Sequence, residues 1–297
     1  MTKIFLAGGT GFVGRQITQD LLNNEYHVRC LVRKGSESKP AAPDRVETAY
    51  GDIGEPHSLK EAMEGCGAVI NLVGIIREFP NRGITFERLH YEGTRNLVDE
   101  AKRQGIKKFI QMSALGADIN ARTVYHRTKA RAEDHLKLSG LRYTIFRPSI
   151  IFGSEDKFVN LFADMMRKLP VIPVIGSGKY MLQPVSVKNV SEGFVRAIEF
   201  SETDDQVYEA GGPDKMEFNA ILDTIGKTLG KRVRKVHIPS WFLKPAVKIM
   251  ERFRFFPLTS DQMKMLLEGN ICDERRFFET FRIKPIIFRE EIRSYIK

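Results

Sequence analysis

The sequence predicts an α/β fold in which a doubly wound parallel sheet is followed by a smaller, mainly C-terminal lobe. Short apolar runs alternate with longer segments of 3.6-residue periodicity through the first half. A glycine-rich turn directly follows the first apolar run, and beyond Pro148 the alternation gives way to helical, aromatic and basic sequence. Strands that alternate with helices indicate right-handed crossovers and a sheet covered on both faces.

The expected strands have the length and composition of buried strands. They are residues 3–8, 27–32, 45–50, 68–73, 107–112 and 142–147. Helical periodicity fills most of the gaps between them, as in 12–24 and 92–105. In the second half we expect helices at 155–169 and 217–230, and short strands at 170–175 and 234–239. The chain therefore divides into residues 1–150, which hold the sheet, and residues 151–297, some segments of which return to the first part.

Composition and charge limit the possible functions. The chain has 297 residues, with 47 Lys and Arg against 37 Asp and Glu, so its net charge is +10. Nucleic acid, anionic lipid or a phosphorylated ligand would suit this charge, but no nucleic-acid motif accompanies it, so nucleic acid is not the expected partner. Three scattered cysteines and six unclustered histidines predict neither disulfides nor a metal site.

The start of the chain and its apolar runs indicate where the protein works. "MTKIFLAGG" enters a strand and a glycine turn at once, which leaves no room for a signal peptide. The longest apolar run, residues 68–76, is less than half the length that crosses a bilayer. We therefore expect a cytoplasmic protein that is soluble or peripheral to the membrane.

The turn "GGTGFVG" is the strongest local signal. It satisfies G-x-x-G-x-x-G through Gly8, Gly11 and Gly14, and G-x-G-x-x-G through Gly9. Such glycines let the backbone turn tightly and approach a pyrophosphate at a helix N-terminus, and this one opens a strand–helix–strand unit. The sequence thus predicts a Rossmann domain over residues 1–150 that binds a dinucleotide. The expected contacts from this turn are Gly8, Gly9, Thr10, Gly11, Phe12, Val13 and Gly14.

The end of the second strand predicts which dinucleotide is bound. An acidic residue there holds the ribose 2′-hydroxyl of NAD, but this strand ends in "CLVRKG" with Arg33 and Lys34. Two cations neutralise a 2′-phosphate, and Arg15 adds to the same pocket. NADP(H) is therefore expected to be preferred over NAD(H). The alternative interpretation is a pair of exposed strand-end charges.

Two more strand ends contribute to the expected cofactor site. After the third strand, Asp52 and Ile53 lie in "YGDIGEP", where the carboxylate could accept a hydrogen bond from an adenine amino group. After the fourth strand, "NLVG" brings Leu72, Val73 and Gly74, and the glycine lets the backbone pass close to the cofactor. Either segment could equally be an ordinary turn.

"TVYHRTKARAE" places Tyr125 and Lys129 four residues apart on one face of an expected helix. An ammonium about 4 Å from a phenol favours the phenolate by up to ~4 kcal/mol at an effective dielectric of 20. That effect would bring the pKa of Tyr125 from about 10 towards 7, where it is useful in acid–base catalysis. The alternative is a helix-face pair that only contacts the cofactor.

The order of these motifs resembles that of the extended short-chain dehydrogenase/reductases. The glycine loop, "GD", "NLVG", Ser113, Tyr-x-x-x-Lys and "RPSIIFG" follow one another in that order. The segments 90–118, 147–163, 183–194 and 257–270 ("PLTSDQMKMLLEGN") look like an atypical branch of this family. That branch contains the nucleotide-binding accessory subunit of respiratory complex I and its bacterial relatives.

The resemblance implies roles for single residues. Lys129 would bind the nicotinamide ribose and Tyr125 would donate the proton, while Ser113 would orient the substrate oxygen and Pro148 would contact the cofactor. Residues 151–297 would form mostly a substrate or lid lobe. The sequence departs from active members at two positions: Ala114 stands where they usually carry a hydroxyl, and His90 where they usually carry asparagine.

Three functions follow as hypotheses. The leading one is an NADPH-dependent oxidoreductase acting on a small or lipophilic carbonyl, quinone-related by family association. The second is a nucleotide-binding assembly or sensor protein without turnover, of the complex I accessory type. The third, supported only by the net charge, is a nucleic-acid-binding regulator that senses redox state.

A late amphipathic segment bears on membrane or respiratory-complex association. As a helix, residues 242–256 would place Phe242, Ala246, Ile249, Met250 and Phe253 on one side, and Lys244, Lys248 and Arg252 on another. An apolar face with a basic flank suits a helix at a membrane interface, and it also suits a lid that packs on the second lobe.

Overall fold

The structure, a computed structural model, describes residues 2–36, 39–251 and 258–297. The chain forms two compact units. Unit 1 comprises residues 1–148, 188–209 and 275–283, and unit 2 comprises residues 149–187, 210–274 and 284–297. The chain therefore leaves unit 1 and returns to it twice.

Unit 1 is built on a seven-stranded sheet in the order β11-β6-β5-β4-β1-β2-β3. The strands are β1 (Lys3–Ala7), β2 (His27–Val32), β3 (Glu47–Tyr50), β4 (Ala68–Asn71), β5 (Lys108–Met112), β6 (Arg142–Pro148) and β11 (Gln206–Ala210). Neighbouring strands from β3 to β6 pair in parallel. The predicted parallel sheet is confirmed. The strand order reverses between β1 and β4, the place where open α/β sheets bind ligands.

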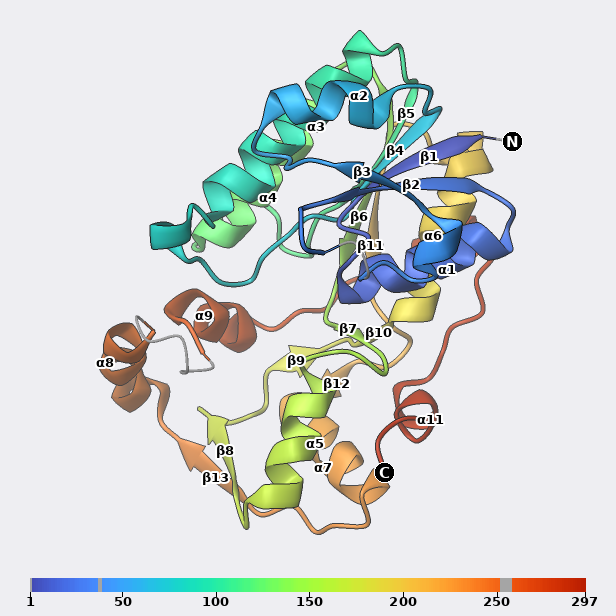
Figure 1. Ribbon diagram of the computed structural model, residues 1–297. Helices are drawn as coiled ribbons and strands as arrows, with labels where there is room; N and C mark the ends of the chain where they lie inside the picture. The colour runs from blue at the N-terminus through green and yellow to red at the C-terminus, as the bar shows by residue number, and fades with distance from the viewer. Residues whose placement is uncertain (1, 37–38, 252–257) are drawn as a thin grey trace. The chain divides into compact units, whose positions relative to one another are not determined.

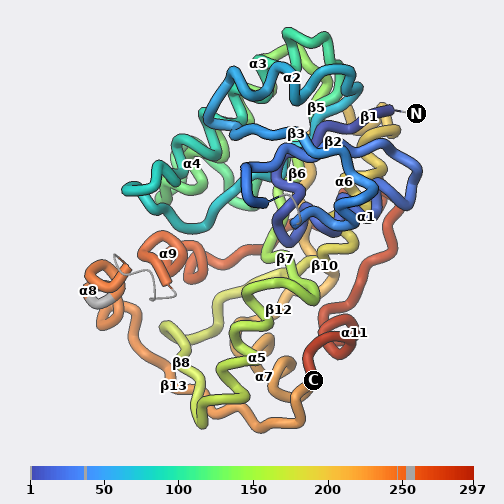
Figure 2. Tube along the Cα trace, viewed as in Figure 1, coloured from blue at the N-terminus to red at the C-terminus, as the bar shows by residue number. Residues whose placement is uncertain are grey.

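Helices cover both faces of this sheet, so the doubly wound prediction is confirmed. Figures 1 and 2 show α1 and α6 on one side, and α2, α3 and α4 on the other. Their bounds are α1 (Phe12–Asn23), α2 (Leu59–Met63), α3 (Gly93–Arg103), α4 (Val124–Lys137), α6 (Val187–Glu199) and α10 (Arg275–Thr280). The π-helical segment Glu87–Glu92 (η4) precedes α3 directly.

The core of unit 1 explains the apolar runs. Phe5, Val69, Phe109 and Ile145 lie on one sheet face and are fully buried. They pack against apolar residues of α2, α3 and α4, including Leu59, Leu97 and Leu136. Strands that are buried on both faces have continuous apolar runs instead of alternation, which is why the strand positions were readable from the sequence.

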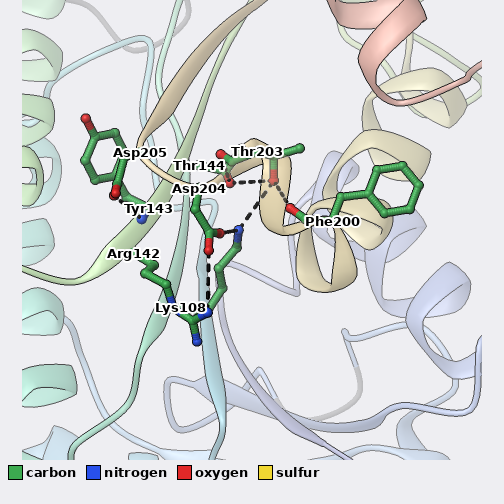
Figure 3. Close-up of polar contacts among 8 residues, drawn as sticks. All are labelled: Lys108, Arg142, Tyr143, Thr144, Phe200, Thr203, Asp204 and Asp205. Carbon is green, nitrogen blue, oxygen red and sulfur yellow. Dashed lines mark hydrogen bonds and ion pairs between the residues drawn. The ribbon is translucent and has the colours of Figure 1, made fainter.

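Two late segments complete unit 1, as Figure 3 shows for part of the first. The turn after α6 carries Thr203 and Asp204, which bind the buried Lys108 at the start of β5. The segment 275–283 adds the phenyl rings of Phe277 and Phe281 against Phe146 of β6. The sequence pattern did not locate β11, α6 or α10, because they depend on contacts with residues far along the chain.

Unit 2 combines short strand pairs with helices. The strands are β7 (Ile151–Phe152), β8 (Ile172–Ile175), β9 (Met181–Leu182), β10 (Val185–Ser186), β12 (Met216–Glu217) and β13 (Lys235–Ile238), paired β10–β7, β12–β9 and β13–β8. The helices are α5 (Val159–Lys168), α7 (Phe218–Thr228), α8 (Ser240–Met250), α9 (Ser260–Glu268) and α11 (Phe288–Ile292). Its core gathers aromatic rings around Phe218, with Phe158, Phe162 and Tyr180 nearby.

The amphipathic segment at 242–256 is only partly described. Helix α8 covers Ser240–Met250, while Arg252, Phe253 and the side chain of Ala246 lie outside the described residues. The side of α8 that packs inward carries the buried Val247. Along the described part of the chain, no helix combines the length and apolarity needed to span a bilayer.

Candidate functional site

The glycine turn joins β1 to α1 at the point where the strand order reverses. Gly8 has a φ of 91°, and a Cβ there would lie 3.0 Å from the Leu72 carbonyl carbon. A Cβ on Gly14 would lie 2.2 Å from the Gly8 carbonyl oxygen. These two glycines are therefore required for packing the turn, whether or not a ligand is bound.

Gly11 differs from its neighbours because it has room. A Cβ there would have only the Gly8 carbonyl oxygen within 4 Å, at 3.5 Å. Gly11 is the N-cap of α1, with no side-chain hydrogen bond to the first turn and no acidic residue in that turn. The positive end of a twelve-residue helix and an open backbone fit a pyrophosphate. Thr10, Phe12 and Val13 lie half-buried around it.

The cations expected at the end of β2 are exposed, and Arg15 reaches the loop that follows them. Arg33 and Lys34 follow β2 and are exposed. The Arg15 guanidinium donates a hydrogen bond from Nη1 to the Lys39 carbonyl oxygen at 3.3 Å, so it reaches the same loop. Three positive side chains thus belong to the α1 start and the β2 loop of unit 1.

Asp52 and Ile53 shape the turn after β3. Asp52 Oδ1 accepts a hydrogen bond from the Gly54 amide at 2.8 Å. The Ile53 side chain is buried in the core, and its carbonyl accepts a hydrogen bond from Asn96 Nδ2 at 2.8 Å. A Cβ on Gly93 would lie 2.4 Å from Ile53 Cδ1. These contacts match the ordinary-turn alternative for this segment.

A buried amide network orders the carboxyl ends of β4 and β5. Asn71 Oδ1 accepts from the Val73 amide at 3.1 Å, and Asn71 Nδ2 donates to Thr94 Oγ1 and Gln111 Oε1, both at 3.0 Å. Gln111 Nε2 in turn donates to the Met112 carbonyl at 2.9 Å. Sequence reasoning did not select Asn71 or Gln111, although polar residues inside two apolar runs were a visible signal.

Lys129 reaches this same edge of the sheet from α4. Its Nζ donates to the Met112 carbonyl at 3.0 Å, and a Cβ on Gly74 would lie 3.2 Å from that Nζ. The lysine is buried, which lowers its pKa to about 8, while the charge of Glu133 opposes the shift. The structure therefore brings Lys129 and the predicted Gly74 together.

Tyr125 lies in an aromatic pocket one helical turn before Lys129. Its ring centroid is 5.7 Å from that of Phe86 and 5.2 Å from those of His90 and His126. Burial raises the pKa of Tyr125 to about 12. The expected lowering by Lys129 is wrong for this arrangement, because burial of the phenol raises the pKa and the charge of Lys129 does not offset it.

His90 ties the loop after β4 to α4. Its Nε2 accepts a hydrogen bond from the Ile75 amide at 3.1 Å, so the ring proton is on Nδ1 and is donated to Thr128 Oγ1 at 3.1 Å. Burial, and then the charge of Lys129, lowers the pKa of His90 to about 2. The imidazole is thus neutral, and it holds in place the two elements that carry Gly74 and Lys129.

The Ser113 hydroxyl is hydrogen-bonded to the acid of a buried ion pair. Its hydroxyl donates to Glu133 Oε1 at 2.5 Å. Arg147 binds the same carboxylate twice, through Nε at 2.9 Å and Nη2 at 2.6 Å, and Lys137 lies 3.3 Å from it. Ser113 and Glu133 are both buried. The hydroxyl expected to orient a substrate oxygen therefore connects the end of β5 to α4.

Glu133 and Pro148 complete this edge of unit 1. Glu133 was missed, although it stands four residues after Lys129 and eight after Tyr125, the spacing of one helix face. Pro148 ends β6, is buried, and its carbonyl accepts the Leu115 amide at 3.0 Å. The neighbouring Ala114 is buried as well.

Neither metal nor disulfide chemistry is offered by the part of the chain that the structure describes. No group of His, Cys, Asp and Glu there has the arrangement of a metal site. Cys30, Cys66 and Cys272 are buried and form no disulfide.

Comparisons with known proteins agree with this geometry. Residues 8–160 match the family described as NAD(P)H-binding. The chain is 31% identical over 275 residues to the Arabidopsis thaliana mitochondrial NADH dehydrogenase [ubiquinone] 1 alpha subcomplex subunit 9, covering 86% of this chain and 66% of that protein. It therefore spans slightly less than two thirds of that relative's length.

Two further matches extend the comparison. The photosystem II assembly factor Ycf39 of Trieres chinensis is 23% identical over 262 residues, covering 88% of this chain and 80% of that protein. A Thermus thermophilus UDP-glucose 4-epimerase in complex with NAD is similar with a TM-score of 0.78 at 18% identity, covering 99% of this chain and 98% of the other. At that identity the last match concerns the fold alone.

Proposed function

The chain belongs to the NAD(P)H-binding family, and on that premise we propose that it holds NADP(H) as a fixed part of its structure, as an assembly or accessory protein without turnover. The observation that carries the proposal is the hydrogen bond from Ser113 to the buried Glu133. A serine hydroxyl has one hydrogen to donate, and here that hydrogen is used. Ala114 offers no replacement.

Carbonyl reduction needs a group that orients the substrate oxygen and an acid whose pKa lies near the working pH. Releasing Ser113 would break a hydrogen bond to a charged acceptor, which costs about 1.5–3 kcal/mol. The pKa of Tyr125, at about 12, makes the phenol a weak acid at neutral pH. Neither requirement is met in this arrangement, which counts against turnover. Gly11, Gly74 and Lys129 still suit a bound nucleotide.

The nucleotide in this proposal is NADP(H). Arg33 and Lys34 at the end of β2, and Arg15, which reaches the loop after them, support this choice, because cations at this strand end suit a 2′-phosphate. Phosphate oxygens accept strong charge-assisted hydrogen bonds from guanidinium groups. The neighbouring positions 37–38 lie outside the described residues.

The partner in this proposal is a membrane-bound electron-transfer complex. Two relatives support it by their names: one is a subunit of a mitochondrial NADH dehydrogenase and the other is an assembly factor of photosystem II. In this role the nucleotide would stabilise the fold, since a ligand that binds only the native state adds to its stability.

A second candidate function is hydride transfer to a small or lipophilic carbonyl, quinone-related by family association. It is favoured by the position of Tyr125 one turn before Lys129, whose amine lies beside Gly74. In that case Tyr125 would donate the proton. The Ser113 hydroxyl would have to give up its hydrogen bond to Glu133 and donate to the substrate oxygen instead.

One experiment separates the two functions. NADPH oxidation is followed by absorbance with a panel of aldehydes, ketones and quinones, alongside thermal unfolding with and without NADPH. We expect NADPH to raise the melting temperature, with no substrate-dependent oxidation in the wild type or in Tyr125→Phe. Turnover that falls by about 10²–10⁴-fold in Tyr125→Phe would instead establish the oxidoreductase.

Gly11→Val provides the matched control for the nucleotide. Its backbone is extended and a Cβ there meets nothing closer than 3.5 Å, so the fold should form. We expect normal unfolding without NADPH and no gain in melting temperature when NADPH is added. Gly14→Val, in contrast, should unfold even without nucleotide, because its side chain would collide with Gly8.

A further inference from the structure

Helix α8 of unit 2 presents large apolar side chains to solvent. Trp241, Phe242 and Ile249 are 72%, 63% and 64% exposed. At 100° per residue these three positions fall within an arc of about 100°. The two neighbouring rings form an edge-to-face pair with centroids 6.0 Å apart. Isolated exposed apolar residues are ordinary, but three on one helix face form a patch of the kind that marks an interaction site.

Two lysines flank this apolar face, and the sequence that precedes α8 is also strongly basic. Lys244 and Lys248 are exposed, and helix geometry places them directly beside Trp241 on the outer side of α8. Residues 224–250 contain seven Lys and Arg and no Asp or Glu; the cations are Lys227, Lys231, Arg232, Arg234, Lys235, Lys244 and Lys248. Within the described residues, only Lys235 of this stretch has an ion pair, with Asp223 at 2.7 Å.

The inward side of α8 shows that the exposed face is not needed for the core. Val247 is 1% exposed, and Leu243 and Met250, one helical turn to either side, are half-buried. The helix is therefore anchored to unit 2 along one side, while Trp241, Phe242 and Ile249 remain on the other. Phe242 and Ile249, which the lid interpretation would pack on the second lobe, are therefore exposed instead.

We propose that the outer face of α8 is a docking surface for an anionic lipid bilayer. Tryptophan settles at the boundary between headgroups and acyl chains, where its ring is apolar and its N–H meets water, and phenylalanine adds apolar area to the face of an interfacial helix. Lysine stems extend along apolar surface and carry their ammonium groups to the headgroups. Apolar burial plus attraction to anionic lipid is the combination by which helices of this kind bind membranes.

Charge complementarity favours a bilayer over other occupants. An acidic protein or a nucleic acid would use Lys244 and Lys248 but would leave Phe242 and Ile249 in water. A second copy of the chain would bury the apolar face but would bring two basic stretches together, and like charges that face each other are unfavourable. Only an anionic, partly apolar surface satisfies both halves of the patch.

The chain contains its own probe for this surface, since Trp241 is its single tryptophan. Emission of the full-length protein is recorded with vesicles of phosphatidylcholine alone and of phosphatidylcholine mixed with phosphatidylglycerol. We expect a shift to shorter wavelength and protection from iodide quenching with the mixed vesicles. The effect should weaken as salt is added, because screening reduces the attraction to anionic lipid.

Two pairs of variants assign the effect to α8. Phe242→Ser should weaken vesicle binding about tenfold, whereas Leu138→Ser, at an 86% exposed position of unit 1, should leave binding unchanged. Lys244→Gln with Lys248→Gln should weaken binding about 25-fold, at about fivefold for each cation. Lys102→Gln with Lys107→Gln removes the same charge from exposed positions of unit 1 and is the matched control.

Several outcomes would overturn the proposal. Absence of a spectral shift with anionic vesicles at low salt would do so. If the α8 variants and their controls lost vesicle binding equally, binding would not depend on α8 and the proposal would fail. A shift that tracks protein concentration without lipid, and disappears in Phe242→Ser, would assign the face to a second copy. A shift produced by DNA or by an acidic polypeptide, and not by vesicles, would assign it to that class of partner.

Discussion

A buried lysine lies at each end of strand β5: Lys108 of the strand itself at the amino end, and Lys129 of α4 at the carboxyl end. The two ends differ in how the charge is compensated. At the amino end, Lys108 binds Asp204 and Thr203, and Asp204 also faces Arg142 at 3.5 Å (Figure 3). At the carboxyl end, Lys129 donates to the Met112 carbonyl, and the acid whose charge acts on it, Glu133, is bound to Arg147 and Ser113. Burial lowers the pKa of both amines.

The difference separates a structural charge from one that can serve a ligand. Asp204 raises the pKa of Lys108 against the effect of burial, and the pair closes the turn after α6 onto the sheet. Lys129 has a carbonyl as its hydrogen-bond acceptor, and its amine faces Gly74 at the edge where dinucleotides bind. A buried lysine without a bound carboxylate reduces stability, which suggests that it is kept for function.

Breaking the pair at the amino end should have the largest effect. Asp204→Asn leaves the Lys108 ammonium buried without its counter-charge, so we expect the free energy of unfolding to fall by about 3 kcal/mol in urea. NADPH affinity should not change, since this end is opposite the cofactor edge. Lys102→Gln on the surface of α3 is the control, with an expected change below about 0.5 kcal/mol. A loss no larger than the control's would contradict the structural role.

At the carboxyl end of β5, Lys129 should make the free energy of unfolding depend on pH. The unfolded chain keeps its Lys129 proton up to the ordinary pKa of 10.5, while the folded chain loses it near 8. Between these values the unfolded state binds more protons, so the free energy of unfolding rises with pH. From pH 8 to pH 10 we expect the wild type to gain about 2 kcal/mol relative to Lys129→Met in urea unfolding.

The same variant links this end to the nucleotide. Without its amine, Lys129→Met should be at least as stable as the wild type at pH 7 in the absence of NADPH, and should bind NADPH at least tenfold more weakly, as for one lost charge-assisted hydrogen bond. Calorimetry gives the affinity. Unchanged NADPH affinity, or a large loss of stability at pH 7, would show that Lys129 has a structural role like that of Lys108.

Ser113→Ala tests the link between the end of β5 and α4. The variant removes one donor from the buried Glu133, which retains its two bonds to Arg147. We expect the free energy of unfolding to fall by about 1–2 kcal/mol, with little change in NADPH affinity. Urea unfolding and calorimetry measure the two quantities. Normal stability together with a lost enzymatic rate would instead return Ser113 to a catalytic role.

The smallest effect on stability is expected at the exposed cations. Arg33→Asp should leave unfolding within about 0.5 kcal/mol of the wild type, because the residue is exposed. It should weaken NADPH binding about tenfold and narrow or invert the preference over NADH, as for one lost charge-assisted contact. Calorimetry with both nucleotides is the measurement. A wild type that binds NADH as tightly as NADPH would contradict the preference.

The sequence by itself determined strands β1 to β6 of the sheet and the phosphate turn. Apolar runs, helical periodicity and the glycines of residues 8–14 are local signals, because a buried strand or a tight turn needs its own residue types whatever lies elsewhere. For the same reason the sequence placed Lys129 and Tyr125 on one helix face, and cations at the end of β2. It also made the aromatic and basic character of α8 visible.

Only the tertiary structure decided the environments of these residues. Ser113 meets Glu133 twenty residues away, Lys108 meets Asp204 ninety-six residues away, and Phe146 packs on Phe277 and Phe281. Hydrogen-bond partners and burial depend on which elements become neighbours, and no local pattern encodes that. A side chain's pKa follows from the same neighbours, so the direction of the shift at Tyr125 could not be predicted from its distance to Lys129 along a helix.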